Sequence, residues 1–129
     1  MGAWGAGSFD NDDAVDWLAD LEHARDLTPI DAAFAAVTGE GEAGEADASV
    51  AIAAAEVVAA IDGRPLADLP GEIVDWLASA RPRPDPGLTE RARAAVQRIR
   101  SSAGLKVMGG EGDSAEWFGH IDDLLRRLG

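Results

Sequence analysis

A chain of 129 residues with 47% hydrophobic residues is long enough for one buried core, so we expect a single domain over residues 1–129. Its net charge of −13 disfavours binding to nucleic acid or to an anionic membrane surface, because both are negatively charged. The lack of cysteine excludes disulfides and thiol chemistry. Without a basic and apolar leader segment, the sequence predicts a cytoplasmic protein.

The chain opens with a segment in which glycine and alanine separate Trp4 and Phe9. The first residues of a domain fray unless they are tied down, so we expect these aromatic side chains to anchor the segment on the domain. Asp10 is expected to cap the first helix, over about residues 11–25, and Asn11, Asp12 and Asp13 follow it. The helix should bury one face, formed by Ala14, Trp17, Leu18 and Leu21.

Two more helices are predicted before residue 64. The second begins at Thr28-Pro29, a cap followed by proline at the first helical position, and runs to about Val37. The third begins at Asp47 or Ser49 and extends to about Ile61, where Gly63 ends it. Because this third helix is apolar on nearly every side, we expect it to be central and buried.

Three helices are predicted in the second half. The fourth begins at Leu69-Pro70 and reaches about Ala80, with Trp76 facing inward. The prolines after it predict a stiff connector. The fifth runs from Thr89 to about Ser102 and is ended by Gly104, and the sixth follows a capping box at Asp113. With no strand predicted, the fold class is an all-α bundle of about six helices, with the Gly/Trp-rich N-terminal segment packed on it.

Glu56 is the single acidic residue on the third predicted helix between residues 50 and 61. A buried carboxylate needs a hydrogen-bonding or charged partner. We therefore expect Glu56 to accept hydrogen bonds from the N-terminal segment, either from backbone N–H groups or from an indole such as that of Trp4. A structural role is preferred, and a functional carboxylate in a pocket is the alternative.

A five-residue sequence is repeated in the first and fourth predicted helices. The sequence Val-Asp-Trp-Leu-Ala occurs at residues 15–19 and again at residues 74–78. Duplication of a helical hairpin is one explanation of this repeat. The other is chance, because both helices dock tryptophan and leucine into one core by the same geometry.

The opening resembles a family of bacterial proteins catalogued as domain of unknown function 4259. Those proteins begin with a Gly-x-Trp-Gly-x-Gly-x-Phe stretch, an Asn-Asp pair and an Asp-Trp pair, which are matched here by Gly2, Trp4, Gly5, Gly7, Phe9, Asn11, Asp12, Asp16 and Trp17. The alanine-rich stretch around Glu56 also resembles the middle helix of the family. The resemblance implies a small cytoplasmic bacterial protein of unassigned role, and it supplies no catalytic residue, substrate or cofactor.

Known site patterns do not match this chain. A calcium-binding loop starting at Asp10 needs glycine and glutamate where Val15 and Leu21 stand. Asp12, Asp16 and Asp20 are spaced for a looser metal site, but solvated carboxylates are typical of a helix start. Glu116 and His120 lack the further ligands that a metal enzyme needs. We therefore expect no metal, no cofactor and no catalytic residue.

The functional hypothesis is based on how charge is distributed along the sequence. Residues 1–64 hold 14 of the 24 acidic residues and two arginines, whereas residues 65–129 are nearly balanced. Four arginines on the fifth helix (Arg91, Arg93, Arg98 and Arg100) are expected to pair within the molecule. The sequence favours a non-catalytic interaction or regulatory protein, of the immunity kind for example, whose acidic surface meets a basic protein partner, or one that self-associates. The alternative is an enzyme or small-ligand binder with a pocket near Glu56, Trp4, Trp17 and Trp76.

Overall fold

A computed structural model of the protein describes residues 12–24, 27–38, 45–64, 71–80, 87–106 and 114–128. Within these ranges every regular element is an α-helix, so the predicted all-α class is confirmed. The helices are α1 (Asp12–His23), α2 (Thr28–Thr38), α3 (Glu45–Ile61), α4 (Gly71–Ala80), α5 (Leu88–Lys106) and α6 (Ser114–Leu128).

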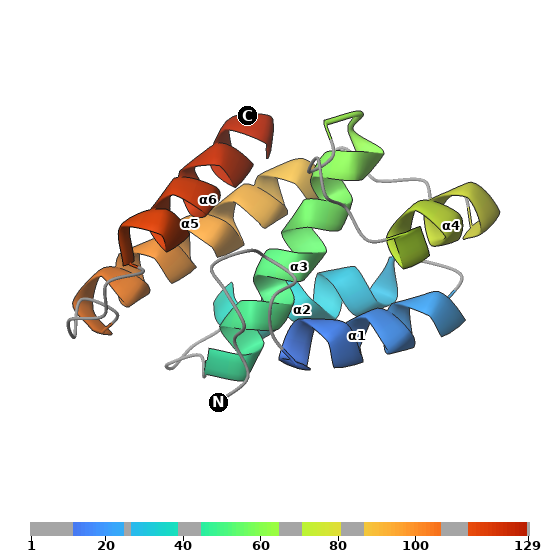
Figure 1. The fold of residues 1–129 in the computed structure, drawn as a ribbon, viewed down its shortest axis with the longest axis horizontal. Coiled ribbons are helices and arrows are strands. Elements are labelled where there is room, and N and C mark those ends of the chain that lie inside the picture. The colour runs from blue at the N-terminus through green and yellow to red at the C-terminus, as the bar shows by residue number, and fades with distance from the viewer. Residues whose placement is uncertain are drawn as a thin grey trace.

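Helix α3 is the centre of the bundle. Every residue from 51 to 59 is buried, and α3 packs against α1, α2, α5 and α6. In Figure 1, α5 and α6 lie on one side of α3, whereas α4 lies on the other. Its small alanines let neighbouring helices approach closely, and its valines and isoleucines fill the space between them. The predicted central position of this helix is confirmed.

The surrounding helices bury the faces that their 3.6-residue periodicity predicts. The first helix buries Ala14, Trp17, Leu18 and Leu21, and the second buries Ile30, Ala33, Phe34 and Val37. On α5 the buried side chains include Leu88, Ala92, Val96 and Ile99, and on α6 they include Ile121, Leu124 and Leu128. Burial of these apolar faces is the main stabilising contribution to the fold.

The end of α3 has a defined turn. Gly63 adopts a positive φ of 84°, its N–H donates to the carbonyl of Ala60 at 3.0 Å, and the N–H of Arg64 donates to the carbonyl of Ala59 at 2.8 Å. This pair of bonds is a Schellman motif, in which glycine tolerates the left-handed backbone. The predicted stop at Gly63 is confirmed, and the turn places Arg64 beside the end of α6.

Two predicted helix boundaries were wrong. Helix α5 continues through Gly104 to Lys106, because a single glycine inside a helix costs only about 1 kcal/mol relative to alanine. Helix α3 begins at Glu45, two residues before the earlier of its two predicted starts. Glutamate and alanine, which stand at positions 45 and 46, are both favourable helix formers.

The predicted anchoring of the N-terminal segment by Trp4 and Phe9 lies outside the described residues, and so do Asp10, Asn11 and the side chain of Asp12. None of the helices within the described ranges is long and apolar enough to cross a membrane.

Candidate functional site

Glu56 lies on the buried face of α3 and forms an ion pair with Arg127 of α6. Its side chain is 1% exposed and that of Arg127 is 15% exposed. The two guanidinium nitrogens Nη1 and Nη2 donate to Oε1 at 2.7 Å and to Oε2 at 3.3 Å. This two-point geometry matches the planar fork of arginine to a carboxylate, which makes it one of the stronger charged contacts available to a protein.

Arg127 also joins the ends of α3 and α6. Its Nε donates to Oδ2 of Asp123 at 2.8 Å, and its Nη1 lies 3.4 Å from the carbonyl oxygen of Arg64. In return, Nη1 of Arg64 donates to the carbonyl oxygen of Arg127 at 3.3 Å. The two arginines therefore each bind a backbone carbonyl of the other, one in the last turn of α6 and one just after the end of α3.

The pKa of Arg127 is raised above its ordinary value by this environment. Partial burial by itself lowers that pKa, but the hydrogen bond and Coulombic attraction from Glu56, followed by those from Asp123, outweigh the effect of burial. The guanidinium therefore stays charged wherever carboxylates are ionised.

The predicted burial of Glu56 is confirmed, and the described residues supply its partner from α6. The expected partners in the N-terminal segment, including Trp4, lie outside the described residues. Sequence reasoning missed Arg127, because it stands 71 residues from Glu56 and is one of two adjacent arginines at the end of an amphipathic helix. The signal that could have found it is the need of a buried carboxylate for a cation.

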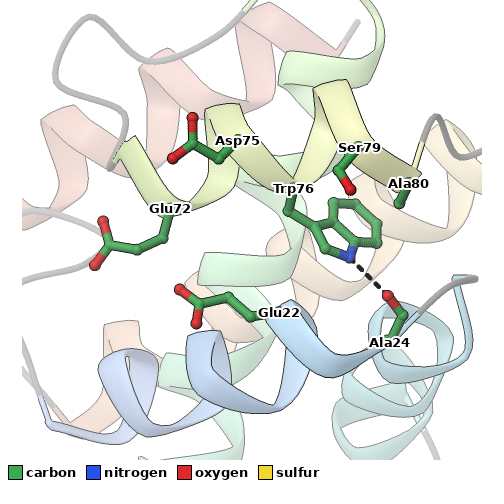
Figure 2. A pocket seen from close by; sticks show the side chains of 7 residues that line it. All are labelled: Glu22, Ala24, Glu72, Asp75, Trp76, Ser79 and Ala80. Atoms are coloured by element: carbon green, nitrogen blue, oxygen red, sulfur yellow. Dashed lines mark hydrogen bonds between the residues drawn. The ribbon is translucent and has the colours of Figure 1, made fainter.

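A pocket of about 300 Å³ lies between α1 and α4. Figure 2 shows the carboxylates of Glu22, Glu72 and Asp75 at one end of it and Trp76 and Ser79 at the other. The indole N–H of Trp76 donates to the carbonyl oxygen of Ala24 at 2.9 Å. That bond ties α4 to the end of α1, and it leaves the carboxylates as the charged groups of the pocket.

The described candidate residues do not converge on one site. Trp17 and Trp76 are both in the hydrophobic core, with 7% and 5% of their surface exposed. Trp76 lines the pocket between α1 and α4, whereas Glu56 and Trp17 do not. Asp16 is exposed on α1. The pocket between α1 and α4 therefore does not combine Glu56 with Trp17 and Trp76, and Trp4 lies outside the described residues.

A second pocket, of about 450 Å³, lies between α2 and α5. Phe34, Ala35 and Ala94 supply apolar lining, and the ion pair between Asp31 and Arg91 contributes polar groups, with Nη2 of Arg91 at 2.9 Å from Oδ1 of Asp31. Both charged side chains are more than two-fifths exposed. The pocket is thus an open groove between helices.

The arginines of α5 behave as predicted where the structure gives their partners. Arg91 pairs with Asp31, and Arg100 pairs with Asp122 of α6 through an Nε to Oδ1 distance of 2.7 Å. Both pairs are within the molecule and exposed, so each contributes little to stability. They nevertheless neutralise the acidic residues that face α5.

Helices α1 to α4 contain no lysine or arginine. The exposed acidic residues of α1 and α4 are Asp16, Asp20, Glu22, Glu72 and Asp75. None of the side chains that the structure describes forms a cluster of metal-ligating residues. The α1–α4 face, defined here as the described exposed residues of these two helices, is therefore acidic, and none of those residues is a lysine or an arginine.

Comparison with known proteins places the chain in a family. A family model described as "Domain of unknown function (DUF4259)" matches residues 2–119. No curated protein and no solved structure matches the chain. Since the model covers most of the length, and in agreement with the resemblance of the opening residues, the chain belongs to the DUF4259 family.

Proposed function

We propose that this protein is a non-catalytic interaction module that presents its α1–α4 face to a basic protein partner. The observation that carries the proposal is the segregation of charge: four consecutive helices lack lysine and arginine, whereas arginines of α5 and α6 pair with acidic residues inside the molecule. An acidic face repels anions and speeds association with a cationic surface. Neutralisation of a basic protein, as by an immunity protein, is one form that this function takes.

The competing hypothesis, an enzyme or ligand-binding protein built around Glu56, has less support. Both carboxylate oxygens of Glu56 accept hydrogen bonds from Arg127, and Glu56 lines neither of the two pockets described above. A carboxylate held in this way supports the packing of α6 on α3. We accordingly place no cofactor, metal or reaction at this residue.

Affinity capture from the source organism tests the proposal. The bait proteins are the wild type, an E72Q/D75N variant of the α1–α4 face, and an E90Q/D122N control that removes the same number of acidic charges from α5 and α6. We expect a partner with a basic surface to be recovered by the wild type and the control, and to be reduced with E72Q/D75N. Equal recovery with all three baits, or no enriched protein, contradicts the proposal.

Sedimentation of the purified protein separates this function from self-association. A basic-partner module does not require a second copy of itself, so we expect a monomer at micromolar concentration. A stable dimer that E72Q/D75N dissociates identifies the α1–α4 face as a contact between copies, and it opposes the proposed function.

A further inference from the structure

Helix α4 buries little of its surface. Of its ten residues, Ile73 and Trp76 are buried and six are exposed, whereas every residue of α3 from 51 to 59 is buried. Leu77 and Ala80 are partly buried and pack against the hydrophobic core. An isolated helix of this length is marginal in water, so α4 depends on its narrow docked face to stay helical.

The contact between α4 and α1 is incomplete. The pocket of about 300 Å³ lies along it, with Glu22 and Ala24 on the α1 side and Glu72, Asp75 and Trp76 on the α4 side (Figure 2). Side chains that border an open space lose the van der Waals contacts that close packing supplies. The pocket therefore removes part of the packing that would hold α4 in place.

Helix α6, which is also peripheral, is tied to the bundle more firmly than α4. It packs against both α3 and α5, and its Arg127 pairs with the buried carboxylate of Glu56. The main neighbour of α4 among the described helices is α1. Within the described residues, one side-chain hydrogen bond connects α4 to another part of the molecule, from Nε1 of Trp76 to the carbonyl oxygen of Ala24. Fewer interactions therefore have to break for α4 to leave the bundle than for α6.

We propose that α4 leaves α1 and unfolds as one unit while the other five helices stay folded, so that the molecule alternates between a closed form and an open form. Local opening of a weakly packed unit costs less free energy than global unfolding. The proposal does not depend on the proposed function. It does add a means of regulation, because the α1–α4 face is a single surface only in the closed form, and a ligand that prefers this form shifts the equilibrium toward it.

Amide hydrogen exchange of the whole protein, followed by NMR at increasing urea below the unfolding transition, tests the proposal. The probes are the N–H groups of residues 75–80 on α4 and 55–59 on α3, which lie inside their helices. We expect the α4 amides to share one protection factor, at least about tenfold lower than that of α3, with a weaker dependence on urea because less surface is exposed. Equal protection and equal urea dependence in the two helices overturn the proposal, and so does a complete lack of protection in α4.

Two conservative variants separate local opening from global unfolding. Trp76→Phe removes the bond to Ala24, so it should lower the protection of α4 and α3 alike by about tenfold, because α4 also unfolds when the whole protein does. Ile121→Val, which removes one buried methyl group from α6, should lower the protection of α3 about fivefold and leave that of α4 unchanged. If Ile121→Val lowers both equally, or if Trp76→Phe leaves α4 unchanged, α4 is not a separately opening unit held by this contact and the proposal fails.

Discussion

Helices α4 and α6 both lie at the periphery of the bundle, but they attach to it with opposite chemistry. Helix α6 is held by a charged contact, in which Arg127 reaches the buried carboxylate of Glu56 on α3. Helix α4 is held by an apolar side chain, Trp76, whose single polar atom donates to the carbonyl of Ala24. On α6, Asp122 and Asp123 are paired with arginines. On α1 and α4, by contrast, Asp16, Asp20, Glu22, Glu72 and Asp75 are exposed.

The difference separates two uses of charge in one small protein. A carboxylate buried against a guanidinium belongs to the fold, because removing either partner leaves an uncompensated charge in a low dielectric. A carboxylate on an exposed helix face contributes almost nothing to the fold, and like charges on that face repel one another. Acidic residues are therefore expected to affect stability strongly near α6, and weakly or in the opposite direction on α1 and α4.

The largest change in stability is expected for Arg127→Met. The substitution keeps an unbranched stem but removes the guanidinium that faces Glu56, whose side chain is 1% exposed, so the free energy of unfolding should fall by about 3–5 kcal/mol. Urea unfolding at neutral pH measures it. A loss below about 1 kcal/mol, as for exposed ion pairs, contradicts the view that this pair is essential to the fold.

Two further variants test whether lost charge or lost packing causes the destabilisation expected for Arg127→Met. Glu56→Gln should cost less than Arg127→Met, because Arg127 keeps Asp123 and some solvent contact. The double variant E56L/R127M removes both charges at once, and it should recover most of the loss, since well-packed apolar residues often replace a buried ion pair at little cost. No recovery in the double variant shows that packing, not charge, governs this contact.

Trp76→Phe is expected to have the next largest effect. Phenylalanine keeps an aromatic ring in the core but loses the N–H that donates to the carbonyl of Ala24 at 2.9 Å, so we expect a loss of about 1–2 kcal/mol. Thermal and urea unfolding measure it, with Trp17→Phe as the comparison on α1. Unfolding that is indistinguishable from the wild type shows that the bond does not hold α4 in place.

The ion pair between Arg100 and Asp122 should contribute little to stability. Both side chains are about half exposed, so Asp122→Asn should lower the free energy of unfolding by less than about 1 kcal/mol, and the difference should shrink as salt is added. Urea unfolding at low and high ionic strength measures both effects. A large loss that does not depend on salt opposes the division between buried and exposed charge.

The smallest effect, and one of opposite sign, is expected for Asp20→Asn on α1. Asp16 and Asp20 are four residues apart on an exposed helix face, where like charges destabilise a helix by about 0.2–0.5 kcal/mol. Removing one charge should therefore stabilise the protein by about that amount at low salt. Stability that falls by 1 kcal/mol or more shows that Asp20 contributes to the fold.

The sequence predicted most of the helices because their signals are local. Proline, glycine and capping residues mark helix ends, and the apolar spacing on α1, α2 and α6 identifies the faces that are buried. Gly104 misled the prediction, since glycine is a weak stop signal when the residues after it can continue a helix. The composition of α3 indicated its central position without any knowledge of its neighbours.

The candidate sites depend on contacts that are distant in sequence. The sequence by itself determined that Glu56 is a buried carboxylate in need of a partner, and that the first half of the chain is acidic. Only the tertiary structure decided that Arg127 meets it, because the contact depends on how α6 packs on α3. It also showed that the two Val-Asp pairs face outward while their tryptophans face inward. Burial of a helix face follows from periodicity, whereas the choice of neighbour follows from the packing of whole helices.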